Sequence, residues 1–437
     1  MNLLILPTQL FNKKYFPTLI HQIIIYEHPY YFTKYKFNKK KLILHRASMK
    51  YYMDYLIKNN FKVIYVEYHQ KLPVKIDQNT TVIFDPIDKI KSLTKYTIIE
   101  SPAFILQKKH YAKYRVKTNK FIFTNFYMWS KKEINLYPEL KSLDKLNREK
   151  LPNHVKIPSI ATISKTDKKY IGEAIKYVKI HFSKNYGTVD NFYYPISYTS
   201  AKKWLINFLK KKLDLFGPYQ DFVNQNNNFM FHSLLSSSLN IGLLVPDDIL
   251  NELKKYYSKV RINSFEGFLR QLFWREYQRY CFIYTNFNEL NYFTTTTNKI
   301  TNAWYKGNLG IPPIDDLIKF GFQTGYIHHI GRLMFIGNFM VLSGISPKAG
   351  FRWFMEFAID SYEWVMYQNV MDMVFFVSGG QTMRRPYITS SNYPLKMSNY
   401  KKAQWSATWD QLYIKFLKKN KEKLWKFRYH FPKLKYL

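Results

Sequence analysis

The sequence predicts an α/β domain, built on a parallel β-sheet flanked by helices, followed by a larger all-α domain. Three observations predict this division. Short apolar runs of strand length recur through residues 1–135, with helical segments between some of them. A polar, basic stretch with three prolines occupies residues 136–169. From residue 170 to 437, apolar residues recur at three- and four-residue spacing, the pattern of amphipathic helices.

The first part contains the strand-length runs that define the predicted sheet. We expect strands at Leu3–Leu6, Ile23–Tyr26, Lys41–Leu44, Val63–Val66 and Val82–Phe84, with a helix at Ala47–Lys58. Alternating strands and helices favour a parallel, Rossmann-like sheet. Pro7-Thr8-Gln9 follows the first strand, so the glycine-rich dinucleotide fingerprint is absent.

The remainder of the chain is predicted to be a linker and a helical domain. Residues 136–169 are expected to cross the surface between the two domains. In residues 170–437 we expect helices over Ala201–Phe216 and Ile314–Ser343, and a final helix with a loose tail over Lys418–Leu437. Turns are predicted at Phe216-Gly217-Pro218, Pro246-Asp247-Asp248 and Gly379-Gly380.

The composition points to a polyanionic partner. There are 67 Lys and Arg against 30 Asp and Glu, a formal net charge of +37, and 19% of residues are aromatic. A strongly positive field attracts nucleic acid. The alternative is AT-biased coding, which also enriches Lys, Asn, Ile, Tyr and Phe. The charge alone does not decide between the two.

The single cysteine limits the chemistry and suggests a compartment. Cys281 excludes an intramolecular disulfide and a four-cysteine metal or iron–sulfur site. We expect a monomer in a reducing, intracellular compartment, with no metal site and no membrane partner. The N-terminus lacks the basic segment of a signal peptide, and no eighteen-residue apolar run is present.

Two segments have residue types that suit an anionic, flat cofactor. Hydroxyl residues cluster in His232–Asn240, where they could donate to phosphate, although taken alone the segment favours plain helix capping. In Glu266–Tyr277, helical spacing places Arg270, Trp274 and Tyr277 on one face. The alternative for this second segment is an aromatic core stripe with peripheral ion pairs.

Three further segments contain candidate catalytic and DNA-binding residues. His328 and His329 are adjacent, so on a helix they point about 100° apart and cannot chelate one metal from one face. Asp360 stands among apolar residues and needs a partner if buried. Basic and aromatic residues alternate over Arg384–Lys402, a pattern that suits DNA phosphates and unstacked bases but also a solvated loop.

Taken together and in this order, the segments resemble the photolyase/cryptochrome superfamily. They are most similar to its photolyase-related branch, which includes the bacterial iron–sulfur (6-4) photolyases. Pro7-Thr8-Gln9-Leu10-Phe11 and Arg46-Ala47-Ser48-Met49-Lys50 belong to the same resemblance. It implies an N-terminal antenna-type domain, a long linker and a helical FAD-binding domain. It also leaves room for a second, antenna chromophore, whose identity the residues do not specify.

The resemblance assigns roles residue by residue. It implies FAD contacts by Tyr219, Ser233, Leu235, Ser236, Gln271, Trp274, Arg275, Arg332, Asp360, Met366 and Asn369. It implies catalytic roles for His328, His329 and Tyr387, electron transfer through Trp353 and Trp364, and DNA contacts by Arg384, Arg385, Lys396 and Lys401. We expect Ser236, Trp274, Arg332 and Asp360 to border one cavity.

The resemblance also implies the reaction and shows where this chain departs from the pattern. Reduced FAD would absorb light and donate an electron to a flipped-out pyrimidine lesion, with His329 as proton donor and His328 in support. Lys401 and Gln404 stand at cluster-cysteine positions, so no iron–sulfur cluster is expected. Relatives often have a polar or acidic group at the position of Met366. Phe354 cannot deprotonate on oxidation as a tyrosine would, and Val377-Ser378-Gly379-Gly380 lacks the acid that the resemblance leads us to expect before the glycines.

Three functional hypotheses follow from these residues. The leading hypothesis is light-driven repair of UV-damaged DNA, with (6-4) photoproducts favoured by the histidine pair. The second is a cryptochrome-like blue-light photoreceptor that keeps FAD but not repair. The third is a DNA-binding protein that has lost its activity.

Overall fold

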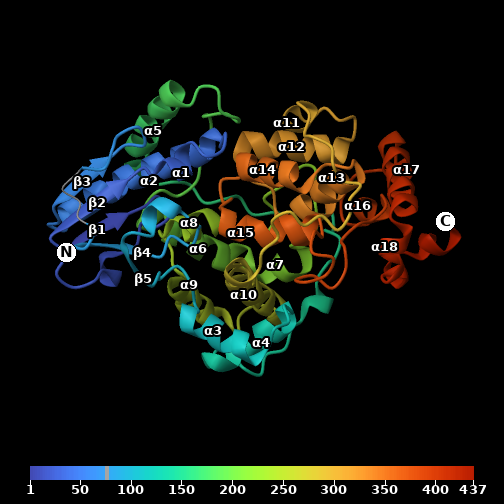
Figure 1. Ribbon diagram of the computed structural model, residues 1–437, viewed down its shortest axis with the longest axis horizontal. Helices are drawn as coiled ribbons and strands as arrows, with labels where there is room; N and C mark the ends of the chain where they lie inside the picture. Colours follow the sequence, from blue (N-terminus) through green and yellow to red (C-terminus); the bar gives the residue numbers. More distant parts are fainter. Residues whose placement is uncertain (74–77) are drawn as a thin grey trace.

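The computed structural model describes residues 1–73 and 78–437. It begins with a five-stranded, all-parallel sheet in the order β3-β2-β1-β4-β5 (Figure 1). The strands are β1 (Asn2–Ile5), β2 (Gln22–Tyr26), β3 (Val63–Val66), β4 (Thr81–Phe84) and β5 (Thr97–Ile99). The chain reverses its direction of progress across the sheet between β1 and β4. The carboxyl ends of these two strands therefore form the switch point of the sheet.

The switch point is closed by a side chain of the chain itself. Gln9 accepts a hydrogen bond from the Leu6 N–H at 3.1 Å and donates one to the Phe84 carbonyl at 2.6 Å. This glutamine, which is 1% exposed, links the ends of β1 and β4 where other sheets of this type have a phosphate-binding loop.

Four of the five observed strands were predicted, and one predicted strand is wrong. Lys41–Leu44 lies inside α2 (Lys39–Lys58), whose start is capped by the Asn38 side chain accepting from the Lys40 N–H at 2.9 Å. Residues 40–49 in the first half of this helix are all buried, so the apolar run there shows no helical period. The predicted helix Ala47–Lys58 is the second half of α2. Strand β5 was not predicted.

Helix α5 (Lys168–His181) packs along α2 and is joined to the sheet by a buried ion cluster. Arg46 from α2 contacts Glu27 at 2.8 Å, Glu67 at 2.8 Å and Glu173 at 2.6 Å. Glu27 and Glu67 directly follow β2 and β3, and Glu173 lies in α5, so one guanidinium of α2 links the ends of two strands to a second helix.

The rest of the described chain is helical, as predicted, with α10 at its centre (Figure 1). Helices α3 (Lys108–Lys117) and α4 (Phe123–Glu133) pack on α10 (Ile262–Tyr284). The contact places Tyr111 of α3 and Phe126 of α4 against Tyr280 of α10. The remaining helices are α1 (Pro29–Phe32), α6 (Tyr198–Lys211), α7 (Leu213–Tyr219), α8 (Ser236–Ile241), α9 (Pro246–Leu253), α11 (Ala303–Lys306), α12 (Pro312–Thr324), α13 (Asn338–Leu342), α14 (Pro347–Phe357), α15 (Glu363–Met366), α16 (Asn392–Lys396), α17 (Gln404–Lys419) and α18 (Lys421–Trp425).

The turn predicted at Phe216-Gly217-Pro218 is wrong, because these residues lie inside α7. A proline within a helix leaves the carbonyl four residues earlier without its N–H partner. Here the Ser264 hydroxyl donates to that carbonyl, Asp214 O, at 2.6 Å and accepts from the Gly217 N–H at 2.9 Å. A side chain from α10 therefore makes the proline tolerable.

Two other local predictions have opposite outcomes. Pro246-Asp247-Asp248 forms the first turn of α9, with Pro246 at the first helical position, so a turn there is wrong. Gly379 and Gly380 lie outside helices with φ of 70° and 125°, which confirms a turn that glycine favours.

The C-terminal segment is docked rather than loose. After α18 the chain forms two short 3₁₀ turns, and Phe431 and Leu434 are 1% and 0% exposed. The tail predicted to be loose is therefore anchored by apolar side chains. Among the described residues, no helix is long and apolar enough to cross a membrane.

Two π-helical segments, Gly331–Gly337 and Tyr367–Val374, pack against each other in the helical part. A Cβ at Gly337 would lie 2.7 Å from a Val374 methyl carbon, so glycine permits this close approach. π-Helical turns are rare and occur mostly at functional sites. The predicted site residues Arg332 and Asn369 lie in these two segments.

Candidate functional site

Asp360 is the centre of a polar cluster drawn from three separate parts of the chain. Its carboxylate accepts from Ser236 of α8 at 2.7 Å and from Arg332 of the first π-helical segment at 2.9 Å. The side chains of Arg332 and Asp360 are only 13% and 12% exposed. The partner that the sequence required for Asp360 is therefore a guanidinium together with a hydroxyl.

The cluster continues to α10 through Asn240, which lies one turn after Ser236. The Asn240 amide donates to the Asp360 carbonyl at 3.1 Å and accepts from Arg275 Nε at 3.3 Å. The Arg275 guanidinium also packs over the Trp364 ring at 5.0 Å. Burial lowers the pKa of Arg275 to about 10, which leaves it charged at neutral pH.

The serine loop, Ser233–Leu235, leads into the first turn of α8, where two hydroxyl groups have no partner in the described structure. The Ser237 and Ser238 hydroxyls are buried and unpartnered among the described residues. Leu234, next to Ser233, has a φ of 56°, a left-handed conformation that strains a non-glycine residue. Buried hydroxyls normally have hydrogen-bond partners, so the first turn of α8, which follows this strained loop, has donors available for a ligand with acceptor oxygens.

The two adjacent histidines have different environments, but only His329 lies in a helical turn, because residues 326–328 are not helical. The expectation that both histidines lie on one helix is therefore wrong. His328 is 5% exposed, stacks on His232 at 4.6 Å, and has both ring nitrogens unpartnered in the described structure. Burial, followed by the nearby His232, holds its pKa well below 6.5.

His329 is exposed, yet desolvation by surrounding protein, followed by the charge of Arg332, lowers its pKa to about 4. His329 is three residues before Arg332, so both belong to one helical turn beside Asp360.

Other predicted cofactor residues lie around this cluster but do not all meet in it. Trp274 stacks on Phe123 at 3.7 Å rather than on a residue of the Asp360 cluster, so the four expected border residues are not brought together. Gln271 donates to Gln220 at 3.4 Å, and Tyr219 packs on Phe231 at 5.7 Å.

Near α15, Met366 is buried and Asn369 is half-buried. The Asn369 amide donates to the Val365 carbonyl at 2.7 Å and accepts from Gln278 at 3.2 Å. Ser233 is half-buried and Leu235 is buried in the serine loop.

The two predicted electron-transfer tryptophans are both buried. Trp353 is 0% exposed, donates to the Trp304 carbonyl at 2.9 Å and packs on Phe357 at 4.8 Å. The Phe357 ring is in turn 5.2 Å from the Arg332 guanidinium. Trp353 is thus separated from the Asp360 cluster by one aromatic ring. Trp364 contacts that cluster through Arg275.

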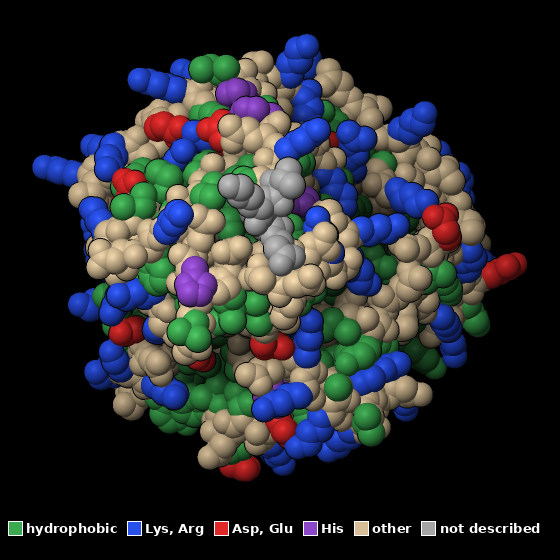
Figure 2. All heavy atoms as spheres, turned by 60° about the vertical axis from the view of Figure 1, so that its left-hand side comes forward, with side chains coloured by type: hydrophobic (Ala, Val, Ile, Leu, Met, Phe, Trp, Pro, Cys, Tyr) green, Lys and Arg blue, Asp and Glu red, His purple; other side chains and the backbone are tan. Residues whose placement is uncertain are grey.

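The predicted DNA-binding residues are on the surface. Arg384, Lys396 and Lys401 are exposed, and Arg385 is half-buried with its guanidinium 5.4 Å from the Tyr387 ring. None of these four cations forms an ion pair with a described carboxylate. Figure 2 shows Lys and Arg spread over the face it presents, with fewer Asp and Glu among them.

The sequence reasoning missed the residues that hold the Asp360 segment in place. Each of residues 361–364 contacts the sheet domain. Lys41 donates to the Ser361 carbonyl, and His45 forms a hydrogen bond with the Tyr362 hydroxyl at 2.8 Å. Tyr35 donates to Glu363 at 2.6 Å, and Asp88 accepts from the Trp364 N–H at 2.9 Å. These partners are roughly 270–330 positions away in sequence, and no local pattern links them.

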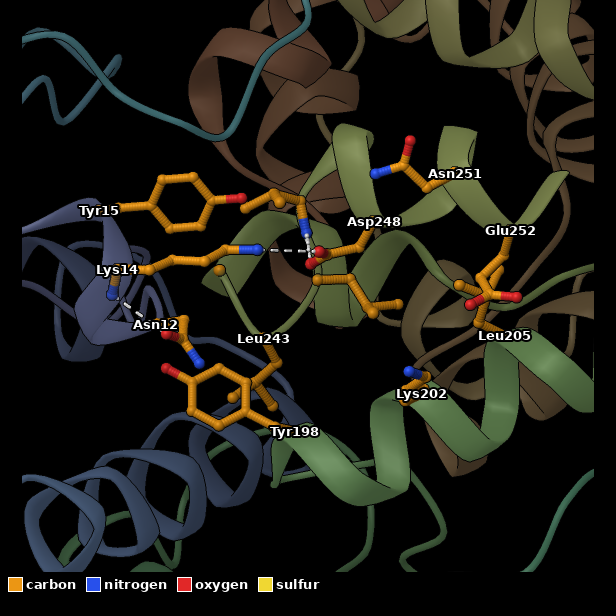
Figure 3. A pocket seen from close by; sticks show the side chains of 13 residues that line it. Asn12, Lys14, Tyr15, Tyr198, Lys202, Leu205, Leu243, Asp248, Asn251 and Glu252 are labelled. Atoms are coloured by element: carbon orange, nitrogen blue, oxygen red, sulfur yellow. Dashed lines mark hydrogen bonds and ion pairs between the residues drawn. The ribbon is translucent and has the colours of Figure 1, made fainter. Parts of the chain in front are cut away.

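A separate cavity of about 290 Å³ lies between the loop after β1, α6 and α9 (Figure 3). The Lys14 ammonium points to Asp248 across it at 3.4 Å, and Tyr198 and Lys202 line the opposite wall. None of the predicted site residues lines this cavity.

Comparison with protein families identifies the chain. Residues 3–194 match the family described as deoxyribodipyrimidine photo-lyase-related protein, and residues 268–423 match the FAD binding domain of DNA photolyase. The chain belongs to the photolyase/cryptochrome superfamily. The second match includes Trp274, Arg332 and Asp360, whereas Ser236 and Asn240 of the Asp360 cluster precede its first residue.

Individual relatives support the same assignment. A (6-4) photolyase of Agrobacterium fabrum is 34% identical over 267 residues, which cover 58% of this chain and 52% of that protein. The match thus spans about half the length of that relative. An uncharacterized protein of Acanthamoeba polyphaga mimivirus is 53% identical over 91 residues, 21% of this chain and 74% of that protein.

Solved structures share the fold of this superfamily member. A cryptochrome of Synechocystis sp. matches 96% of this chain and 89% of its own, with a TM-score of 0.64 and 15% identity. A class III photolyase of Agrobacterium tumefaciens matches 88% of this chain and 81% of its own, with a TM-score of 0.57 and 16% identity.

Proposed function

We propose that the protein binds FAD and uses light to repair UV-damaged DNA, with (6-4) photoproducts as its substrate. The observation that carries this proposal is the Ser236–Asp360–Arg332 cluster beside His329. The donor set fits FAD: unpartnered serine hydroxyls and two guanidinium groups suit a pyrophosphate, and a carboxylate suits a flavin ring N–H. When bound, FAD would supply light absorption and electron donation.

The chain's own residues would bind and orient the flavin and the DNA, and would donate a proton to the lesion. Arg332 and Ser236 fix the Asp360 carboxylate, and each carboxylate oxygen can accept a second hydrogen bond from a ligand. Arg275, desolvated and held by Asn240, is positioned for an anionic group. Exposed Arg384, Lys396 and Lys401 would contact DNA phosphates, with Tyr387 beside an unstacked base.

The acid role of His329 depends on the DNA itself. With a pKa of about 4, His329 is neutral at pH 7 in the protein alone. Bound phosphates would raise this pKa, because a nearby negative charge favours the imidazolium form. The proton would then be available only when DNA is bound beside His329. His328, fully buried, would support the ring beside it.

A photoreceptor without repair is the second candidate function. The low pKa of His329 favours it, because a neutral imidazole is a weak proton donor at neutral pH. In this case FAD binding through the Asp360 cluster would remain, while the exposed basic residues would serve another partner or none.

Several narrower proposals accompany the function. We place the domain boundaries at 1–135, 136–169 and 170–437, and the reaction within a monomer. A second chromophore, the lack of an iron–sulfur cluster, and an intracellular, reducing location remain predictions. The same repair assay tests whether activity survives the departures at Met366, Phe354 and Ser378.

Repair of defined lesions tests the proposal. Oligonucleotides with a single (6-4) photoproduct or cyclobutane dimer are illuminated with blue light or kept dark, with wild-type protein, His329→Ala and His154→Ala. His154 is an exposed histidine in the linker and serves as the matched control. We expect light-dependent loss of the (6-4) lesion with wild type and His154→Ala only. Repair of the dimer alone would overturn the substrate, and no repair of either lesion would favour the photoreceptor.

A further inference from the structure

The last part of the chain, Lys415–Leu437, has an unusual surface that the proposed flavin site does not use. Nine lysine and arginine residues lie between Lys415 and Lys435, against a single acid, Glu422. None of the nine forms an ion pair with a described carboxylate. In Figure 1 this segment, α17 and α18 with the C-terminus, stands beside α16 at one end of the molecule.

Exposed aromatic rings are concentrated in the same segment. Trp425, Tyr429 and Tyr436 are 47%, 78% and 88% exposed. Only one other Phe, Trp or Tyr ring in the described chain is similarly exposed to solvent, that of Tyr257 at 44%. Three of four such rings thus lie within twelve residues, although the whole chain is rich in aromatics.

The rings are held on a firm base rather than on a mobile tail. Leu424, Phe431 and Leu434, each 0–1% exposed, pack into the core from the same segment. The Lys423 carbonyl accepts from the Tyr292 hydroxyl at 2.8 Å. The segment therefore buries its aliphatic side chains and leaves its polar-tipped rings in water.

Charge and rings are interleaved at close range. The Arg428 guanidinium lies 5.5 Å from the Trp425 ring and 4.8 Å from the Tyr429 ring, because residues three and one positions apart meet on this short turn. Desolvation lowers the pKa of His430, and the nearby positive charge of Arg385 lowers it further. Arg385 is one of the predicted DNA contacts. The surface thus adjoins the expected DNA side of the protein.

We propose that residues 415–437 bind an unpaired DNA strand, by stacking bases on Trp425, Tyr429 and Tyr436 and by holding phosphates with the surrounding lysines. Aromatic platforms within a positive surface are the recognised means of gripping single strands without sequence preference. A membrane surface is disfavoured, because the segment buries the aliphatic side chains that would insert into lipid. The inference rests on the proposed function only in naming DNA as the partner.

Binding in the dark separates stacking from charge. Fluorescence anisotropy measures the affinity for an undamaged oligothymidylate of about 16 nucleotides, a length within the range of single-strand sites. The same measurement is made with an undamaged duplex. The variants are Trp425→Ala/Tyr429→Ala/Tyr436→Ala and, as matched control, Tyr257→Ala. The rings are exposed, and circular dichroism with a melting curve checks that each variant is folded.

We expect the triple variant to lose at least about tenfold in single-strand affinity, since stacking on one ring alone can account for that factor. Duplex binding should change less than about threefold, and Tyr257→Ala should match wild type. Unchanged single-strand affinity would overturn the proposal, and so would an equal loss for single strand and duplex. Binding to anionic vesicles that falls in parallel with single-strand binding would favour a lipid surface and also overturn it.

The result for single-strand binding can be distinguished from the result for lesion repair. If no lesion is repaired but the triple variant loses single-strand binding as expected, the proposed function fails alone. If repair proceeds and the triple variant binds the single strand like wild type, the inference from the C-terminal segment fails alone.

Discussion

Asp88 gives the sharpest test of how the sheet domain holds the Asp360 segment. Its side chain is 3% exposed, and one oxygen accepts from the Trp364 N–H while the other has no partner among the described residues. Burial, and then the like charge of Glu363, raises its pKa from 3.8 to about 7. The Trp364 N–H and the positive charges of Lys41 and Lys34 oppose this rise.

The size and sign of the effect follow from the two pKa values. One pKa unit is worth about 1.4 kcal/mol, so a shift of about three units corresponds to roughly 4 kcal/mol. Between pH 4 and 7 the folded protein keeps a proton on Asp88 that the unfolded chain has lost. Raising the pH across this window therefore lowers the free energy of unfolding, and above about pH 7 this contribution is constant.

Asp88→Asn should remove this dependence. The amide oxygen can still accept from the Trp364 N–H, and the side chain stays neutral at every pH. Urea unfolding of both proteins from pH 4.5 to 8 gives the difference in unfolding free energy, wild type minus variant, in which most other titrating groups cancel. We expect this difference to fall by up to about 4 kcal/mol as the pH rises. A difference independent of pH would refute the buried, protonated state of Asp88.

Three further predictions address the ligand, the electron path and the packing. Ser237→Ala/Ser238→Ala should leave the unfolding free energy of the FAD-free protein nearly unchanged, because both hydroxyls are unpartnered, but should weaken FAD binding by about tenfold or more in fluorescence titration. Unchanged affinity would exclude these two hydroxyls of α8 from the FAD contacts. Trp353→Phe should slow light-driven reduction of bound flavin in transient absorption without changing FAD content, and an unchanged rate would remove Trp353 from the electron path. Gly337→Ala should lower the unfolding free energy by about 1–3 kcal/mol, because the new methyl group would clash with Val374. Gly172→Ala, in a helix and with nothing within 4 Å of the added Cβ, should raise the unfolding free energy by roughly 0.5–1 kcal/mol. Equal effects of the two changes would contradict the close packing of the π-helical segments.

Local patterns predicted four of the five strands and the helical character of the second part, and the failures of individual predictions have physical causes. Val63–Val66 was predicted with its observed bounds because it is a short apolar run bounded by polar residues. Lys41–Leu44 looked the same but belongs to the buried first half of a helix, for which short apolar runs are ambiguous. The Phe216-Gly217-Pro218 error arose from a hydroxyl on α10 that no local rule could supply.

The candidate site was predictable in its residue types but not in its full geometry. The need of Asp360 for a partner follows from the cost of burying a charge, and Arg332 and Ser236 were already candidates. The direction of the Trp274 ring is set by Phe123, 151 positions earlier in the chain, so helical spacing could not predict it. The clamp on residues 361–364 and the stack of His232 on His328 likewise join distant parts of the chain.

The most direct test of the account is the flavin content of purified protein with and without the Asp360 carboxylate. Absorption spectra, followed by release and quantification of the cofactor, are compared for wild type, Asp360→Ala and Tyr257→Ala. We expect about one FAD per chain in wild type and Tyr257→Ala, and little or none in a folded Asp360→Ala. A colourless wild-type protein that takes up no added FAD, or an Asp360→Ala variant that retains it fully, would contradict the claim that this cluster holds the flavin.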